Sequence, residues 1–256
     1  MRKVLALLFV LVACSGNEPA ANPDPPPQPA PTSSKPASND AGPPADAGPH
    51  MANEALRRCA ESKGDIASIA DAVARMNAII SKGGDGACFV ATLPRPLAVV
   101  ATLNTASAQP AGGLGAPRMF FMLPKIVISA VPEGTGSKAL EFGEWTGTKS
   151  TIKGEIALPV TTPLAADAPF THILDGPDRT TCATCHAQEE PHPTIPKAFI
   201  SDALRPAKEV MLPELEELHT LCINAGVDSP RCNFIHALFD FGEVTQGAFS
   251  PVVATN

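Results

Sequence analysis

The 256-residue chain carries 26 acidic against 19 basic side chains, which gives a formal net charge of −7 at pH 7. A net negative charge disfavours nucleic acid and anionic lipid headgroups as electrostatic partners. The sequence has no Tyr and a single Trp, Trp145, so it does not predict an aromatic surface of the kind on which nucleic acid bases stack.

The N-terminus has the pattern of an export signal. The basic segment Met1–Lys3 precedes an apolar run from Val4 to Val12. This run is too short to span a bilayer as a mature helix, but it suits the apolar region of a signal peptide. The sequence therefore predicts a signal peptide over residues 1–13 and a mature protein outside the cytoplasm.

The end of this signal, Leu11-Val12-Ala13-Cys14, resembles the lipobox of bacterial lipoproteins. The resemblance implies cleavage before Cys14 and attachment of lipid to its thiol and new amino group, and several acyl chains together anchor a protein stably. Ser15 follows the lipidated position where some lipoproteins carry Asp, and the resemblance then implies the outer membrane. An ordinary secretory signal with an incidental Cys is the alternative.

Residues 14–50 are rich in Pro, Ala, Asn, Asp and Ser and contain no aromatic side chain. Such a segment cannot bury a core, and it favours extended polyproline conformations. At about 3.1 Å per residue it would reach on the order of 100 Å. We predict a disordered tether over residues 14–50 and one folded domain over residues 51–256, which is long enough for a sizeable core.

Helical segments are predicted at both ends of the domain. Near its start, Glu54–Ser62 forms one helix, and a second is capped by Asp65 and stopped by a pair of glycines. Near its end, Pro213–Gly226 forms a helix, and another follows a cap at Asp228 or Ser229. The last two are expected to form a helical hairpin.

Between these ends, runs of β-branched and aromatic residues are separated by Gly- and Pro-rich turns. The predicted strands are Cys88–Thr92, Leu97–Leu103, Met119–Leu123, Ile126–Val131, Leu140–Trp145 and Ile152–Val160. No helical pattern interrupts them, so we expect an antiparallel meander or small sandwich rather than βαβ units. The predicted fold class is α+β, with a loop-like segment after Pro163.

That segment contains Cys182-Ala183-Thr184-Cys185-His186, a C-x-x-C-H motif. The spacing lets two thiols form thioethers with the two vinyl groups of one porphyrin and places the histidine beneath the iron. The motif resembles the haem-attachment site of c-type cytochromes. The resemblance implies covalent haem c, held by Cys182 and Cys185 with His186 as an axial iron ligand.

The remaining cysteines are consistent with this assignment. Of the seven, Cys14 is assigned to lipid and two to haem, which leaves Cys59, Cys88, Cys222 and Cys232. An even remainder in an oxidising compartment predicts two disulfides. Cys222 and Cys232 lie on successive predicted helices, so we expect them to pair with each other and Cys59 to pair with Cys88. Four cysteines allow three pairings, so the sequence does not fix the connectivity.

Three other uses of the motif stay open. A structural zinc site would draw on Cys182, Cys185, His186 and His192, although adjacent Cys and His rarely both reach one tetrahedral ion. A plain disulfide between Cys182 and Cys185 is the second. A thioredoxin-like redox pair is the third, but it belongs between a strand and a helix of an α/β unit, and no such unit is visible.

The iron ligand opposite His186 is not determined by the motif. Met211 and His192 are candidates, and ligation by either would suit electron transfer. An open sixth position would instead allow gas binding or peroxide chemistry. The other histidines are expected to be structural or at the surface: His172, His219 and His236. Four basic residues are candidate partners for the haem propionates: Arg179, Lys197, Arg205 and Lys208.

In the common small cytochrome c fold, the motif follows an N-terminal helix, whereas here it follows strands. A β-rich domain with a late C-x-x-C-H is similar to the cytochrome P460 group. That group carries a lysine cross-linked to the porphyrin and acts on small nitrogen species. The resemblance would assign the lysine to Lys125, Lys149 or Lys153, and no local pattern selects one.

Together, these features predict a lipid-anchored monohaem c-type cytochrome of the bacterial cell envelope. Its expected role is one-electron transfer to an unidentified redox protein partner. One alternative is a non-haem structural or binding lipoprotein, with the cysteine pair as a disulfide or zinc staple. Another is a haem enzyme or gas sensor with an open axial site.

Overall fold

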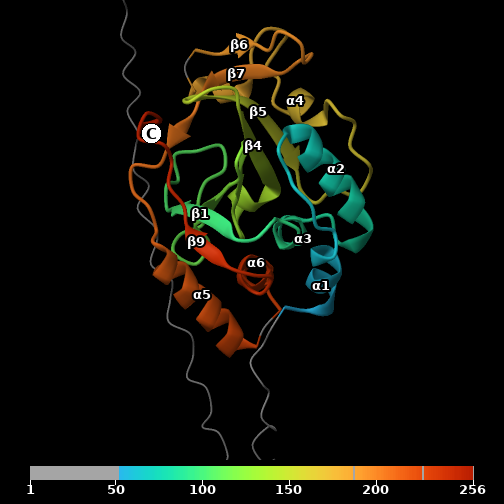
Figure 1. The fold of residues 1–256 in the computed structure, drawn as a ribbon, viewed down its shortest axis with the longest axis vertical. Helices are drawn as coiled ribbons and strands as arrows, with labels where there is room; N and C mark the ends of the chain where they lie inside the picture. The colour runs from blue at the N-terminus through green and yellow to red at the C-terminus, as the bar shows by residue number, and fades with distance from the viewer. Residues whose placement is uncertain (1–51, 187, 227, 256) are drawn as a thin grey trace, which may run out of the picture. The chain divides into compact units, whose positions relative to one another are not determined.

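The structure is a computed structural model that describes residues 52–186, 188–226 and 228–255 (Figure 1). The predicted signal peptide, the predicted lipidation residue Cys14 and the predicted tether up to residue 50 lie outside the described residues, and they stay predictions. The described part is a mixed α+β fold with a mostly antiparallel eight-stranded sheet, which confirms the predicted class.

Five strands form an antiparallel meander, and they confirm five of the six predicted strands. They are β1 (Leu97–Thr102), β2 (Arg118–Met122), β3 (Ile126–Ala130), β4 (Ala139–Trp145) and β5 (Ser150–Ala157). Three short strands were not predicted and extend the sheet at its edges: β6 (Glu190–Pro191), β7 (Phe199–Asp202) and β9 (Val244–Gln246). The strand order is β6-β7-β5-β4-β3-β2-β1-β9, and β9 is parallel to β1. A separate parallel pair joins β8 (Leu204–Arg205) to β10 (Ala254–Thr255).

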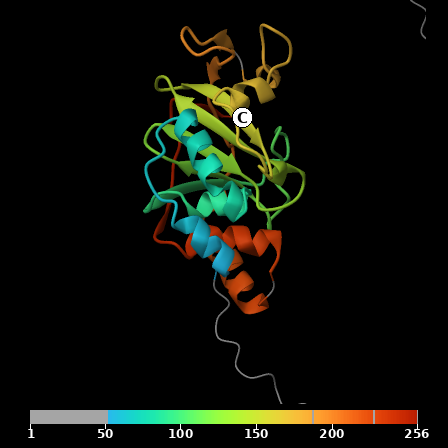
Figure 2. The ribbon, with the colours of Figure 1, turned by 90° about the vertical axis from the view of Figure 1, so that its right-hand side faces the viewer.

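The described α-helices are α1 (Glu54–Ala60), α2 (Ile69–Ile79), α3 (Gly86–Ala91), α4 (Ala168–His172), α5 (Leu212–Ala225) and α6 (Pro230–Phe239). Short 3-10 turns are η1 (Ile80–Lys82), η2 (Thr135–Lys138) and η3 (Thr181–Thr184). In Figures 1 and 2, α1, α2 and α3 lie on one side of the sheet, and α5 and α6 lie toward one end of it.

One face of the meander forms the hydrophobic core with the helices. Alternate strand residues on this face are fully buried: Met119, Phe121, Ile126, Ile128, Leu140 and Ile156. The ring of Phe121 lies 6.3 Å from that of Phe234 in α6, and the ring of Phe89 in α3 meets that of Phe142 edge-on at 6.5 Å. Removal of these apolar side chains from water is the main force that holds the helices on the sheet.

The predicted strand over Cys88–Thr92 is wrong, because most of this segment lies in helix α3. Asp85 caps the helix, and its carboxylate accepts a hydrogen bond from the amide of Cys88 at 2.7 Å. A short apolar run that is buried on all sides has no periodicity that separates strand from helix. The predicted cap at Asp65 is also wrong, because α2 begins after Ser68, whose hydroxyl accepts from the amide of Asp71.

Both ends of the C-terminal hairpin follow the predicted signals. Helix α5 ends at Gly226, which has a φ of 60° and so takes the left-handed conformation that glycine favours. Helix α6 is capped by Ser229, whose hydroxyl accepts from the amide of Cys232 at 3.1 Å.

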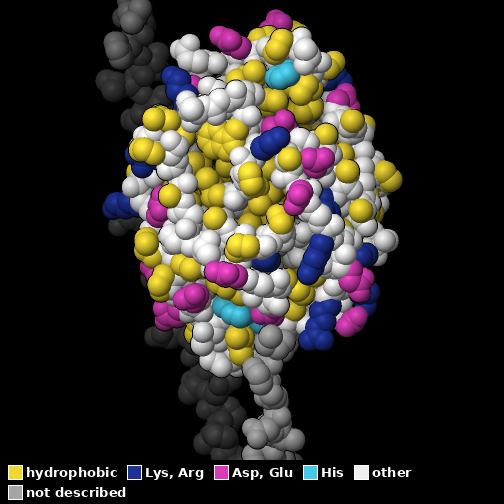
Figure 3. Space-filling view, in the orientation of Figure 1, with side chains coloured by type: hydrophobic (Ala, Val, Ile, Leu, Met, Phe, Trp, Pro, Cys, Tyr) yellow, Lys and Arg dark blue, Asp and Glu magenta, His cyan; other side chains and the backbone are white. Residues whose placement is uncertain are grey.

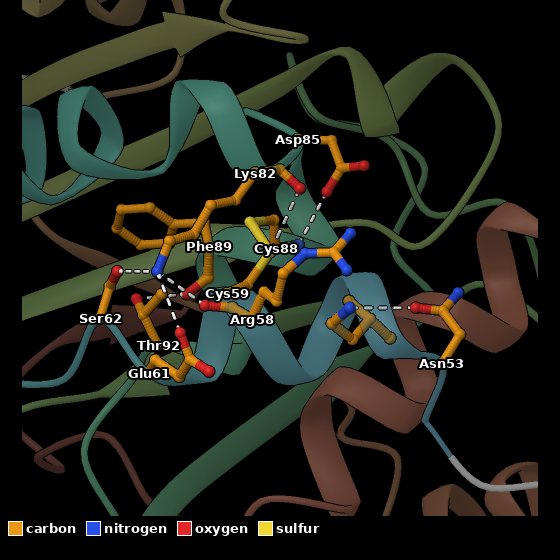
Figure 4. Close-up of a disulfide and its surroundings, with 11 residues drawn as sticks. Asn53, Arg58, Cys59, Glu61, Ser62, Lys82, Asp85, Cys88, Phe89 and Thr92 are labelled. Atoms are coloured by element: carbon orange, nitrogen blue, oxygen red, sulfur yellow. Dashed lines mark hydrogen bonds and ion pairs between the residues drawn. A yellow bond between two sulfur atoms is a disulfide. The ribbon is translucent and has the colours of Figure 1, made fainter.

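Both predicted disulfides are present, Cys59–Cys88 and Cys222–Cys232. Figure 4 shows the first, which joins α1 to α3 beside Lys82, and the ammonium of Lys82 donates to the carbonyl of Arg58 at 2.8 Å. Two disulfides indicate an oxidising, extracytoplasmic compartment. None of the described helices has the length and apolar character needed to cross a bilayer.

Candidate functional site

The second face of the meander forms the floor of a pocket. Its alternate strand residues include aromatic, charged and hydroxyl side chains: Arg118, Phe120, Ser129, Glu141, Trp145, Thr151, Lys153 and Glu155. The register places Phe120, Ser129, Glu141 and Glu155 in one row across four strands. The pocket has an empty volume of about 1130 Å³, which includes space open to solvent.

The C-x-x-C-H motif forms part of the wall of this pocket. Its three chemically active residues, Cys182, Cys185 and His186, all line the pocket. The motif lies on a loop that starts with η3, and the hydroxyl of Thr180 caps this turn by accepting from the amide of Cys182 at 3.1 Å. The carboxylate of Glu189 in turn accepts from the amide of Thr180 at 2.7 Å. These local hydrogen bonds fix the conformation of the loop that carries the motif.

The imidazole of His186 is oriented by the backbone of β7. Its Nδ1 lies 2.7 Å from the carbonyl oxygen of Asp202, and since a carbonyl only accepts, Nδ1 carries the proton. Nε2 is then unprotonated, which is the state of a histidine that ligates a metal. Burial, reinforced by the positive charge of Lys153, lowers the pKa of His186 to about 4, so the ring is neutral at pH 7.

The two motif cysteines are free thiols, so the plain disulfide is not formed. Burial raises the pKa of Cys182, which keeps it protonated at neutral pH, while Cys185 is exposed. Zinc sites and thiol redox centres both use thiolates, so this environment favours neither. Within the described ranges, the four zinc ligands considered above do not form a cluster with the spacing of a metal site. They are Cys182, Cys185, His186 and His192.

A buried cation, Lys153 of β5, lies beside the motif. Its ammonium donates to the hydroxyl of Thr151 at 2.7 Å and to the carbonyl of Asp202 at 3.1 Å. Lys153 and His186 therefore share one acceptor. Burial lowers the pKa of Lys153 to about 8. Of the three lysines in the strand region, Lys153 alone lines the pocket, and Lys125 and Lys149 are exposed.

The pocket also holds the ion pair of Arg118 and Glu141, whose Nη2 and Oε2 atoms are 2.5 Å apart. The guanidinium lies over the ring of Phe120, 4.7 Å from its centroid. In the described structure, two buried atoms of this pair, Arg118 Nε and Glu141 Oε1, have no hydrogen-bond partner. Buried polar atoms are normally satisfied, so these atoms indicate a polar group that the pocket is built to receive.

Of the four basic residues considered for the propionates, Arg205 lines the pocket. Its Nε donates to the carbonyl of Val253 at 3.0 Å. Arg179 and Lys197 form ion pairs with acidic residues that do not line the pocket, and Lys208 is exposed. The cationic groups at the pocket are therefore Arg118, Lys153 and Arg205.

The two candidates for the second axial ligand lie outside the pocket lining. Met211 is 51% exposed at the N-cap of α5. His192 is half-buried, and its Nδ1 accepts from the amides of Thr194 and Ile195 at 3.2 and 3.0 Å. Among the described residues that line the pocket, His186 is the only His, and there is no Met.

The sequence did carry a signal for this pocket. In β5, Thr151, Lys153 and Glu155 alternate with apolar Ile152 and Ile156. Side chains two apart on a strand share a face, so the polar set marks a surface opposite the core. The pairing of β7 with β5, which supplies the carbonyl for His186, had no such signal.

The chain matches no family model, no curated protein and no solved structure. Its function therefore has to be inferred from the pocket. The residues present fit a covalently bound haem. Two thiols with the required spacing line the pocket beside a neutral imidazole, and aromatic walls and cations complete it. The two atoms without partners among the described residues, Arg118 Nε and Glu141 Oε1, suit a ligand that carries carboxylates. Arg118 Nε would donate to one ligand carboxylate, and Glu141 Oε1 would meet a protonated ligand carboxyl group or a bridging water.

Proposed function

We propose that this chain is a monohaem c-type protein that binds haem c between the meander and the C-x-x-C-H loop. The observation that carries the proposal is the convergence of Cys182, Cys185 and His186 on one pocket, with His186 Nδ1 fixed to the carbonyl of Asp202. The S–H of each cysteine would add across one vinyl C=C, and His186 Nε2 would ligate the iron. Haem supplies an iron centre that cycles between two oxidation states.

The rest of the pocket supports this assignment. Phe120, Trp145 and Phe249 offer aromatic surface for a flat apolar ring. Arg118 and Arg205 are always charged and suit planar carboxylates such as the propionates. A propionate would also offer an acceptor to Arg118 Nε, the one guanidinium nitrogen without a hydrogen-bond partner among the described residues.

The role that we propose is one-electron transfer outside the cytoplasm. Exposure of Cys185 would bring one edge of the haem to the surface, where a partner redox protein could approach. In Figure 3, Lys and Arg side chains are interspersed with Asp and Glu, so the visible face has no broad patch of one charge. Lipid on Cys14 and the tether would hold the domain at the outer membrane.

Haem staining after denaturing electrophoresis tests the cofactor directly. The chain is expressed with a haem-maturation system, and we expect a covalently retained c-type spectrum that is lost in Cys182→Ala/Cys185→Ala. His186→Ala should lose the native axial ligation, whereas His192→Ala serves as a matched control and should keep it. No haem stain from the wild-type chain would refute the proposal and favour a non-haem binding lipoprotein.

Labelled palmitate tests the anchor independently. We expect the label to enter the wild-type chain and to be lost in Cys14→Ala. Equal labelling of the two would refute the lipid anchor but would leave the haem proposal standing.

A second candidate is a haem enzyme or gas sensor with an open sixth position. It is favoured by the absence of any second His or Met among the described residues that line the pocket. The buried amine of Lys153 lies beside the motif, and this position supports the cytochrome P460 resemblance, which implies a lysine near the porphyrin. A five-coordinate high-spin spectrum, or carbon monoxide binding to the reduced protein, would favour this candidate. A six-coordinate low-spin spectrum would favour electron transfer.

A further inference from the structure

The C-terminal hairpin brings two imidazoles and one carboxylate together. His219 Nε2 of α5 lies 2.7 Å from Asp240 Oδ1, and His236 Nδ1 of α6 lies 2.9 Å from Asp240 Oδ2. One potential ligand atom from each residue can be chosen so that all lie within 4.8 Å of one another. None of the three lines the pocket described above. In the described part of the chain, this is the only group of three or more such residues with that spacing.

The covalent frame around this cluster is rigid. Asp240 caps α6 one turn after His236. The disulfide Cys222–Cys232 joins the two helices three residues after His219 and four residues before His236 in the sequence. Residues three or four apart on a helix share a face, so the disulfide lies beside the cluster on both helices. The ligand atoms are therefore held near one another before any ion arrives.

Further contacts orient individual groups, as is usual around metal ligands. The amide of Ala52 donates to Asp240 Oδ2 at 2.6 Å and fixes the carboxylate. The ring of His219 stacks on that of Phe239, with centroids 5.0 Å apart and planes at 20°. The side chains of His236 and Asp240 are 1% and 3% exposed, whereas that of His219 is 18% exposed. The cluster is therefore buried on the side of His236 and Asp240 and reaches solvent on the side of His219.

We propose that His219, His236 and Asp240 form a zinc-binding site that is separate from the haem pocket. Two imidazoles and one carboxylate are a common ligand set for this ion, and they leave a fourth tetrahedral position for water. Magnesium and calcium prefer all-oxygen ligands, so they fit this set less well. Coordination would replace the two N–H···O hydrogen bonds by bonds to the ion, with the proton of each ligating nitrogen moving to the other nitrogen of the same ring, and the ion would link α5 to α6.

Zinc content and affinity test the site. The chain is stripped with a chelator and dialysed, and zinc binding is measured by calorimetry and elemental analysis, which separates zinc from haem iron. We expect one zinc per chain. Bound zinc should also raise the unfolding temperature, since a ligand specific for the folded state stabilises it by RT ln(1 + [Zn]/Kd).

His219→Gln is the decisive variant, because Gln keeps an N–H donor for Asp240 but is a poor zinc ligand. We expect its affinity to fall more than about 100-fold, since loss of an orienting group alone typically costs 10–100-fold. His172→Gln is the matched control, and it removes a half-exposed histidine paired with Glu155. Cys182→Ser/Cys185→Ser separates this site from zinc binding at the motif, and it should bind zinc as the wild type does.

Three results would overturn the proposal. They are no stoichiometric zinc on the wild-type chain, unchanged affinity in His219→Gln, and loss of the zinc in Cys182→Ser/Cys185→Ser. If His219→Gln fails to fold, Asp240→Asn replaces it. The retained side chain shape should then preserve the fold while zinc affinity falls in the same way, and unchanged affinity would again overturn the site.

Discussion

Replacement of Lys153 by Met should stabilise the haem-free chain. Burial lowers the pKa of Lys153 from 10.5 to about 8. Because one pKa unit corresponds to 1.36 kcal/mol, the charged ammonium costs about 3 kcal/mol of folding free energy at pH 7. Lys153→Met removes this cost but also removes the hydrogen bonds to Thr151 and to the carbonyl of Asp202, which contribute about 1 kcal/mol each. The expected net gain is about 1 kcal/mol at pH 7.

The sign of the pH dependence makes this prediction specific. Since the folded state has the lower pKa, the unfolded chain binds more protons between pH 8 and 10.5, and wild-type stability rises across that range. The destabilisation is complete below pH 8 and disappears above pH 10.5. The advantage of Lys153→Met should therefore be largest at pH 7 and should vanish by pH 10.5.

Urea unfolding of both chains, expressed without haem maturation, measures this difference at the two pH values. Lys149→Met is the matched control on an exposed side chain, and it should change the free energy of unfolding by less than about 0.5 kcal/mol. A destabilised Lys153→Met at pH 7, or an advantage that persists at pH 10.5, would refute the reasoning.

Two further predictions concern the frame of the domain. Double Ala replacement of Cys59–Cys88, with a sequence separation of 29, should cost about 3.6 kcal/mol, and that of Cys222–Cys232, with a separation of 10, about 2.7 kcal/mol. Urea unfolding checks both, and a reversed order would contradict the loop-entropy argument. Gly84→Ala should destabilise the chain by more than about 1 kcal/mol, because its φ is +64° and the added Cβ would lie 2.2 Å from a carbonyl oxygen. Thermal unfolding beside Gly113→Ala, which has positive φ but open space, separates the clash from the backbone strain, and equal losses would exclude the clash.

Local patterns account for the parts of the fold that the sequence predicted. Buried and more exposed side chains alternate along meander strands such as β2 and β4. Gly226 marks the end of α5, and Ser229 marks the start of α6. The even number of cysteines left after the lipid and haem assignments indicated two disulfides. The failures were at segments whose conformation depends on distant partners. Helix α3 is buried on all sides and tied by Cys88 to α1, so its five-residue apolar run looked like a strand. Short β7 is a strand only because β5 lies beside it.

The residues of the candidate site also fall into two groups, those that a local sequence pattern predicts and those that depend on distant partners. The spacing of Cys182, Cys185 and His186 is a local pattern, and it was sufficient to nominate them. The position of Lys153 beside the motif does not follow from a local pattern, because it depends on the strand register and on the pairing of β7 with β5. Neither is visible in a single sequence. The same holds for the cluster of His219 with Asp240, which requires the packing of α5 against α6.

If the chain binds haem as proposed, the carbonyl of Asp202 would connect Lys153 to the histidine that ligates the iron. Lys153 and His186 both donate to it, at 3.1 and 2.7 Å. With haem bound, the ammonium would withdraw electron density from this acceptor and add positive charge near the iron, and both effects would favour the reduced state. An interaction of about 1 kcal/mol corresponds to about 40 mV for one electron. We therefore expect Lys153→Met to lower the reduction potential by tens of millivolts in a redox titration, while Lys149→Met leaves it unchanged. An unchanged potential in Lys153→Met, with haem still attached, would show that the shared carbonyl does not transmit the charge to the iron.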